Sequence, residues 1–182
     1  MSDTKKKKFY ILLTRFPDRW SRMIGVFTNS IYTHASIGLE EDMNTYYSFV
    51  WKGFIVESIT RYLRPDRDPY TCELYEYEIS TEQYDTMKRM LHKFADNKHI
   101  YSFARVELIF GLMKMPIITK NKYYCSQFIA DVLKESKVLN TKRNSARFFP
   151  KDFGKIEGAK MIFKGDLLGY VNKYSLLPAS AQ

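Results

Sequence analysis

Short strand-like segments fill most of the first 80 residues, and this feature limits the folds that the chain can adopt. Residues 8–15 (KFYILLTR) form an apolar run that is too short for a typical helix, which predicts a buried strand. Residues 31–39 alternate between two faces, and a polar turn joins them to 45–51 in a predicted hairpin. Further strands are predicted at 53–59 and 70–79. Helices and then closing strands follow, and this order of elements predicts an α+β fold.

Apolar residues recur at helical spacing in three segments that lie outside these strands. One spans residues 17–28, and another spans 102–113. The longest, at 81–96, begins with a predicted capping box in which Ser80 and Gln83 satisfy each other's backbone N–H groups. Its predicted buried face consists of Tyr84, Met87, Leu91 and Phe94.

The length and composition fit a single domain that covers residues 1–182. Hydrophobic residues make up 45% of the chain and aromatic residues 16%, which is enough to bury a core. Residues 160–165 and 166–171 predict a closing pair of strands. The basic N-terminal segment 1–8 and the C-terminal segment 176–182 are expected to be flexible.

The cysteine content indicates the compartment. The two cysteines, Cys72 and Cys125, are too few for a disulfide framework, which predicts free thiols in a reducing environment. The chain has no apolar run of about 18 residues that could span a membrane, and its start lacks the pattern of a signal peptide. We therefore expect a cytoplasmic protein without a transmembrane segment.

The charge balance bears on possible partners. The chain carries 29 Lys and Arg against 20 Asp and Glu, a formal net charge of +9 that favours an anionic substrate or partner. The basic residues run from KKKK at 5–8 to TKRNSAR at 141–147 without a continuous stripe, and no nucleic-acid-binding motif accompanies them. We therefore expect no specific nucleic-acid partner. No feature of the sequence indicates an oligomeric state.

Cys125 is the first candidate for chemistry, because it opens a predicted helix (YYCSQFIADVL, residues 123–133). Phe128, Ile129 and Val132 follow at helical spacing, so the cysteine shares the face that packs inward. The free backbone N–H groups of a first helical turn stabilise a thiolate and also provide half of an oxyanion hole. The alternative role for Cys125 is that of a small buried apolar residue.

A nucleophilic cysteine needs an imidazole that takes its proton, and His34 is the best candidate. It shares one face of the predicted strand with Ser36 and Gly38, whose small size would let a helix N-terminus approach. The alternative is a histidine with a structural role. His92 and His99 are weaker partners, because both fall in or just after the exposed helix 81–96.

A third group usually fixes the tautomer and orientation of the imidazole. Ser48 lies on the strand that returns from the hairpin, whereas Glu57 on the next strand is the better partner for an imidazolium. The alternatives are a small cross-strand filler for Ser48 and a solvent-facing carboxylate for Glu57. No zinc-ligand motif occurs in the sequence, so we expect neither a metal nor a cofactor.

The two stretches FYILLTRFPDRWSRMIGVFTNSIYTHASIGLE and YYCSQFIADVLKESKV resemble the permuted branch of the NlpC/P60 papain-like superfamily. This branch contains the YiiX/YycO-like proteins, which are related to lecithin retinol acyltransferase. Its members place the histidine on a strand and the cysteine later, at a helix start. The resemblance covers residues 9–60 and 118–138 well and 61–117 in outline.

The resemblance implies an antiparallel sheet packed against the cysteine helix, with Cys125 as nucleophile and His34 as base. Ser48 falls where relatives often have a carboxylate or histidine, which leaves Glu57 as the alternative third residue. Tyr124 matches an aromatic residue next to the cysteine, and Ser126 and Gln127 are further candidates for substrate contact.

The leading functional hypothesis is a cysteine hydrolase that cleaves amide or ester bonds through a thioester acyl-enzyme. The acyl substrate would be a small molecule, a peptide or a lipid, and acyl transfer is equally compatible with the sequence. One alternative is a binding module that keeps the fold but has weak or no activity. Another is a basic protein that binds a membrane surface or nucleic acid through the lysines at 5–8.

Overall fold

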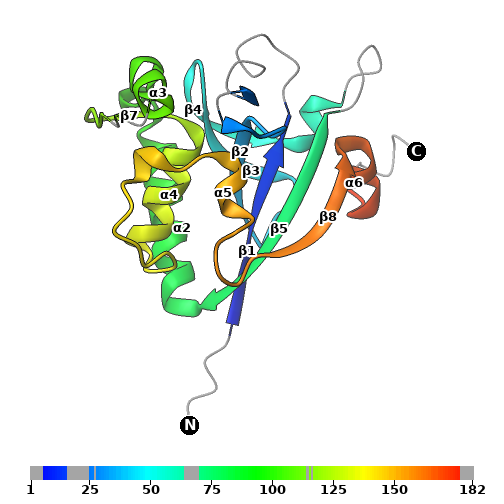
Figure 1. Cartoon of the computed structure of the whole chain (residues 1–182). Coiled ribbons are helices and arrows are strands. Elements are labelled where there is room, and N and C mark those ends of the chain that lie inside the picture. The colour runs from blue at the N-terminus through cyan, green and yellow to red at the C-terminus, as the bar shows by residue number, and fades with distance from the viewer. Residues whose placement is uncertain are drawn as a thin grey trace.

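A six-stranded antiparallel sheet, with helices on both faces, forms the centre of the computed structural model (Figure 1). The structure describes residues 6–15, 25–26, 28–63, 70–113, 115 and 117–176. The strand order is β4-β3-β2-β1-β5-β8. The strands are β1 (Lys6–Thr14), β2 (His34–Leu39), β3 (Thr45–Val50), β4 (Gly53–Ser58), β5 (Thr71–Ser80) and β8 (Lys160–Asp166). The predicted α+β class is therefore confirmed.

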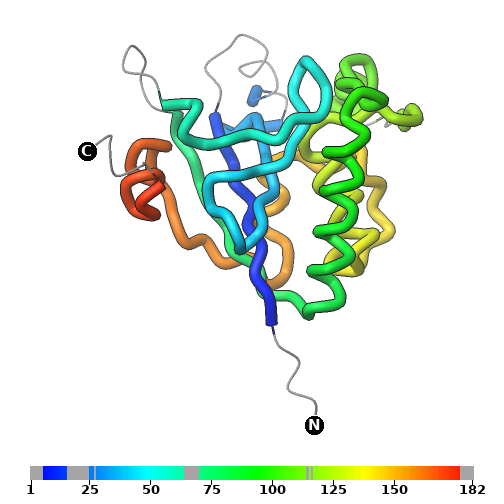
Figure 2. Tube along the Cα trace, turned by 180° about the vertical axis from the view of Figure 1, so that it is seen from behind, coloured from blue at the N-terminus to red at the C-terminus, as the bar shows by residue number. Residues whose placement is uncertain are grey.

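The helices lie on opposite sides of this sheet. Figures 1 and 2 both place α2 (Thr81–Asp96) and α4 (Cys125–Glu135) on one side and α6 (Leu167–Lys173) on the other. The shorter elements are η1 (Ile59–Tyr62), η2 (Lys98–Ile100), α3 (Arg105–Leu112), η3 (Ser145–Arg147) and α5 (Pro150–Phe153). A small parallel pair, β6 (Ser102–Phe103) and β7 (Lys122–Tyr123), lies between η2 and α4 in the chain.

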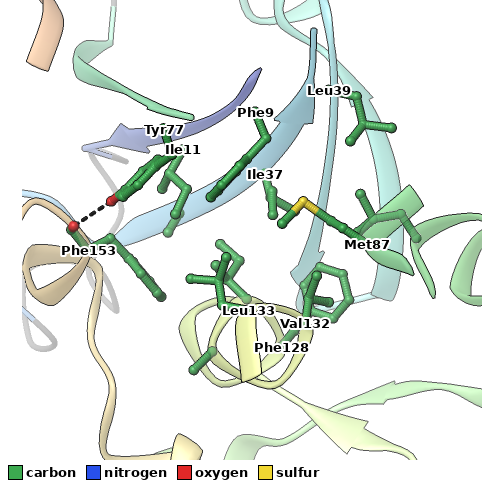
Figure 3. Packing of buried hydrophobic residues seen from close by; sticks show 14 of the residues in the cluster. Phe9, Ile11, Ile37, Leu39, Tyr77, Met87, Phe128, Val132, Leu133 and Phe153 are labelled. Carbon is green, nitrogen blue, oxygen red and sulfur yellow. Dashed lines mark hydrogen bonds between the residues drawn. The ribbon is translucent and has the colours of Figure 1, made fainter. Parts of the chain in front are cut away.

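Strand β1 is covered on both faces, which explains its uninterrupted apolar sequence. Phe9 and Ile11 belong to the core that α2 and α4 complete, whereas Tyr10 and Leu12 belong to the core beneath α6. Figure 3 shows the first of these cores, in which the sheet and the two helices contribute Phe9, Ile11, Ile37, Met87, Phe128 and Val132, among others.

The predictions for α2 are confirmed. Ser80 accepts a hydrogen bond from the Gln83 backbone N–H, and the Gln83 side chain accepts one from the Ser80 backbone N–H. The four residues of the predicted apolar face are all buried. The strand predicted at 160–165 corresponds to β8, and the helix predicted at 102–113 corresponds to the shorter α3.

The strand predicted at 166–171 is wrong, because this segment forms α6. The Asp166 side chain caps the helix by accepting a hydrogen bond from the Gly169 backbone N–H, and the buried residues Leu167, Tyr170 and Val171 recur at helical spacing. Such a short apolar segment fits either pattern when only the sequence is considered.

Residues 6–8, which we expected to be flexible, belong to β1 and pair with the end of β5. Leu176 donates its backbone N–H to the Val171 carbonyl, and the remaining residues of both predicted flexible termini lie outside the described ranges. Most of the helix predicted at 17–28 also lies outside them. Within those ranges, no helix has both the length and the apolar character that crossing a bilayer requires.

Candidate active site

Cys125 is the first residue of α4, as the sequence predicts. Phe128, Ile129 and Val132 are fully buried against the sheet, and this packing fixes the axis of the helix. Tyr124 occupies the N-cap position with an extended backbone, and no side chain caps the helix. Because first-turn N–H groups have no partner within a helix, they remain available to an anion next to the Cys125 thiol.

His34 is the first residue of β2 and lies next to both Cys125 and Glu57. Its Nε2 atom is 3.2 Å from Glu57 Oε1, and the two side chains are 6% and 5% exposed. The His34 ring also forms a hydrogen-bonding interaction with the Cys125 thiol. Since Glu57 engages Nε2, we infer that Nδ1 is the nitrogen that faces the thiol.

The electrostatics of this group favour a protonated His34. Burial alone would lower the pKa of His34, but the charge of Glu57 and the hydrogen bonds with Cys125 and Glu57 raise it to about 10. Burial alone would raise the pKa of Glu57, but the charge and hydrogen bond of His34 and a hydrogen bond from Tyr62 lower it. The buried pair is therefore an imidazolium and a carboxylate.

Tyr62 completes the group, and the sequence analysis did not identify it. Its hydroxyl donates a 2.6 Å hydrogen bond to Glu57 Oε2, the oxygen that His34 does not use. Burial and the charge of Glu57 raise the pKa of Tyr62, so the hydroxyl stays protonated as a donor. Tyr62 ends η1, five residues after Glu57, and this sequence spacing carries no recognisable motif.

Of the two candidates for the third residue, the structure brings Glu57 to His34 and places Ser48 elsewhere. The Ser48 hydroxyl donates a 2.7 Å hydrogen bond to the Ala35 carbonyl and is fully buried. Ser48 therefore has the cross-strand filling role that the sequence left open. Glu57 is buried against His34, so its alternative as a solvent-facing carboxylate is wrong.

The sheet register places Glu57 on the same face of the sheet as His34. Gly38, which shares a strand face with His34, pairs with Tyr46, and Tyr46 in turn pairs with Glu57. Glu57 therefore lies on the same face as His34, two strands away. His34 lies four residues along β2 from Gly38, so the register gives the shared face, and the 3.2 Å contact shows that the two side chains meet on it.

We expected the small residues Ser36 and Gly38 to let the N-terminus of the cysteine helix approach, but α4 does not pack on their face of β2. Helix α4 packs on the face that carries Ala35 and Ile37, whereas Gly38 lies against Tyr46. A Cβ atom at Gly38 would come within 2.7 Å of the Tyr46 ring, so the small residue makes room for that tyrosine. His34 meets Cys125 because it lies at the end of its strand.

The three residues next to Cys125 that were candidates for substrate contact are all buried. The Tyr124 hydroxyl donates to the Ala146 carbonyl, and the Ser126 hydroxyl donates a 2.7 Å hydrogen bond to the Phe148 carbonyl. Both side chains therefore anchor the η3 segment to the start of α4. The Gln127 amide group has no hydrogen-bond partner in the part of the chain that the structure describes.

A cavity of about 600 Å³ adjoins the carboxylate end of this group. It follows the outer edge of β4 and η1 and is lined by Lys52, Ile55, Val56, Glu57, Ser58, Arg61, Tyr62 and Tyr70. Within the described ranges, neither Lys52 nor Arg61 pairs with a carboxylate. The cavity is therefore electropositive at its rim and aromatic and aliphatic on its walls.

Cys72 is the second free thiol and contrasts with Cys125. It is fully buried in the core beneath α6, and burial, with Asp166 and Glu73 adding to the effect, raises its pKa to about 12. It therefore stays a protonated thiol at neutral pH. The described residues contain no group of three His, Cys, Asp or Glu side chains placed to hold a metal ion.

A scan of the chain against protein-family models found no match, and a search of curated proteins found none either. The functional argument therefore depends on the geometry of Cys125, His34, Glu57 and Tyr62.

Proposed function

We propose that this protein is a cysteine hydrolase of the permuted NlpC/P60 papain-like type, acting on an amide or ester bond. The observation that supports the proposal is the buried chain of contacts from Cys125 through His34 and Glu57 to Tyr62. A thiol at a helix N-terminus, an imidazole and an orienting carboxylate are the groups that nucleophilic acyl chemistry needs. Stability alone gives little reason to bury them together.

In the proposed mechanism, the thiol proton already lies on Nδ1 of the His34 imidazolium, and the Cys125 Sγ thiolate attacks the carbonyl carbon. The oxyanion that forms accepts hydrogen bonds from backbone N–H groups of the first turn of α4. His34 then donates the proton to the leaving amine or alcohol, and a thioester remains on Cys125. The neutral His34 then deprotonates water, which attacks the thioester, releases the acid and restores the thiolate–imidazolium pair. An alcohol or amine in place of water would make the same site an acyltransferase.

Glu57 and Tyr62 act as positioning residues in this scheme. Glu57 accepts the Nε2–H of His34, which keeps Nδ1 directed at the thiol and stabilises the imidazolium form. Tyr62 in turn fixes Glu57. An ionised carboxylate supports an imidazolium better than a hydroxyl would, so the argument for an inactive binding module, which depended on Ser48 as a weak orienting group, loses its basis.

The cavity beside Glu57 supports an anionic substrate. The cavity lies beyond His34 on the Glu57 side and is lined by neither His34 nor Cys125, so it can hold a part of the substrate that is remote from the reacting carbonyl. The charge of Glu57 is balanced by His34, so Lys52 and Arg61 leave the cavity with a positive charge. We propose that the cavity holds an acidic substituent and a small apolar portion of the substrate, away from the scissile bond.

Alkylation kinetics test the proposal directly. Iodoacetamide is expected to label Cys125 rapidly even below about pH 7, while Cys72 in the same molecule stays unlabelled as an internal control. His34→Ala should abolish the rapid labelling of Cys125, and His92→Ala, a histidine on the exposed side of α2, should leave it unchanged. Peptide mass spectrometry gives both rates in one digest.

The chemical step needs its own measurement. Incubation with activated acyl esters, followed by intact-mass analysis, should reveal an acyl adduct that hydroxylamine removes and that Cys125→Ala lacks. If Cys125 reacts no faster than an ordinary thiol, or reacts equally well without His34, the proposed mechanism is wrong.

A further inference from the structure

Exposed apolar side chains gather in one part of the chain. The described residues include 13 large apolar side chains that are exposed, and seven of them lie between positions 100 and 118. These seven are Ile100, Val106, Ile109, Met113, Met115, Ile117 and Ile118, which are 43–60% exposed. Trp51, 41% exposed, adds an eighth through its contacts with Arg105 and Phe103. We call these eight residues the α3 patch.

Helix α3 carries apolar residues on two faces, although only one face is buried. Leu108 packs inward in a small core with Ala104, Tyr124 and Ala146. Val106, Ile109 and Met113 follow one another at steps of three and four on the outer side. A helix that is apolar all round needs a second partner to cover its outer face.

The segment of the chain that carries most of the α3 patch is mostly basic. Residues 97–130 contain five Lys or Arg and a single acidic residue, Glu107. Glu107 is 4% exposed and pairs with Lys122 at 3.7 Å, so its charge is hidden and neutralised. Lys120 is exposed, and the Arg105 guanidinium lies 4.6 Å from the centre of the Trp51 ring.

We propose that the α3 patch is a docking surface for an anionic lipid bilayer, which α3, Met115, Ile117 and Ile118 contact from one side. Exposed aliphatic side chains bordered by lysine and arginine, together with a tryptophan, are the elements by which a peripheral protein binds the headgroup region. The absence of an accessible carboxylate between positions 97 and 130 matches a negatively charged surface.

This surface differs from the membrane site that the N-terminal lysines suggest. Lys6, Lys7 and Lys8 belong to β1, and each forms an ion pair with a glutamate. The partners are Glu78, Glu40 and Glu76, respectively. Their charges are therefore compensated within the sheet. The α3 patch, in contrast, combines positive charge with apolar area that can leave water.

The position of the α3 patch relates to the candidate active site. Tyr124, the residue before Cys125, packs in the same small core as Leu108 of α3. Figure 1 shows α3 and β7 at one corner of the molecule, next to the start of α4. Docking would therefore bring the helix of Cys125 close to the lipid surface. Binding itself does not depend on the proposed chemistry.

Vesicle flotation tests the proposal with matched variants. The protein should bind vesicles of phosphatidylcholine with about 30% phosphatidylglycerol, bind pure phosphatidylcholine far more weakly, and dissociate as salt rises from about 0.1 M to about 0.5 M. The double variant Ile109→Ser/Met113→Ser should lower the partition coefficient ~10-fold or more, because it removes apolar area that enters the bilayer. Met161→Ser/Leu168→Ser changes two side chains of similar exposure, on β8 and α6, and should bind as the parent does.

Three results would overturn the docking proposal. The first is a lack of binding to either vesicle type by the folded parent. The second is equal loss of binding in the α3 variant and in the β8/α6 control. The third is a parent that elutes as an oligomer and becomes monomeric when Ile109 and Met113 are changed, which would make the patch a contact between copies. A Cys125→Ala variant should bind vesicles normally, so this test is separate from the test of the hydrolase.

Discussion

Glu57→Gln is the substitution that most directly tests the electrostatics of the candidate site. Glutamine keeps the size of the side chain and can still accept the hydrogen bond from His34 Nε2, but it removes the negative charge. In the parent, the charge of Glu57 is the foremost influence that opposes the burial of His34. Without that charge, burial dominates, and the pKa of His34 should fall far below its value in the parent.

The size of the effect follows from the pKa of about 10 for His34. At pH 8, a group with this pKa is about 99% protonated, whereas a histidine with the ordinary value of about 6.5 is about 3% protonated. The parent and the Glu57→Gln variant should therefore hold opposite forms of His34 at the same pH. Iodoacetamide labelling of Cys125 at that pH should slow in the variant, because the thiolate loses its cation.

Heteronuclear NMR of the imidazole rings measures this protonation directly. The chain has only three histidines, so His92→Gln and His99→Gln variants are enough to assign the His34 signals. The His34 ring should show the imidazolium pattern at about pH 8 in the parent and the neutral pattern in Glu57→Gln. If His34 titrates near pH 6.5 in the parent, or if Glu57→Gln does not change its titration, the proposed ion pair does not exist.

Three further predictions concern stability. The pKa of His34 is higher in the folded chain (about 10) than in the unfolded chain (about 6.5). Its contribution to the free energy of unfolding is therefore complete below about pH 6.5 and is lost as the pH rises toward about 10. Urea denaturation of the parent should show this fall in stability, and a stability that rises over the same range would contradict the assignment. Tyr62→Phe should cost about 1–3 kcal/mol, because Glu57 Oε2 loses its donor in a buried site, and a loss within the error of a urea titration would show that this hydrogen bond contributes little. Gly38→Ala should cost about 1–3 kcal/mol by thermal or urea unfolding, because the new methyl group meets the buried Tyr46 ring. Gly158→Ala meets nothing within 4 Å but has a φ of 81°, so its cost reports backbone strain without crowding.

The sequence was sufficient for the elements whose signals are local. The Ser80 and Gln83 capping box, the buried face of α2 and the start of α4 at Cys125 all depend on residues within a few positions of one another. The alternation along β2 likewise depends on neighbouring residues. The pairing of Cys125 with His34, in contrast, needed the resemblance as well, because 91 residues separate them and spacing carries no contact information over that distance.

The parts that sequence reasoning missed depend on contacts across the sheet. Glu57 and Ser48 were both open as partners of His34, because both lie on its face of the sheet. Only the hydrogen bonds separate them: Glu57 contacts His34, whereas the Ser48 hydroxyl donates to the Ala35 carbonyl. Tyr62 reaches Glu57 only because η1 folds back after β4. The segment 166–171 fits a strand in isolation and becomes a helix because Asp166 caps it and Tyr170 bonds to Tyr46 on the facing sheet.

The buried ion pair of His34 and Glu57 is better explained by chemistry than by stability. Removing two charges from water usually costs as much as their attraction returns, and apolar residues of the same volume are often equally stable or more so. A chain under selection for stability alone would gain little from an imidazolium and a carboxylate beneath a sheet of this size. The position of the ion pair offers the other explanation, because the imidazole lies between that carboxylate and a thiol at an uncapped helix N-terminus. In the proposed mechanism the same charges lower the barrier to nucleophilic attack, and stabilisation of the transition state offsets the cost of burying them.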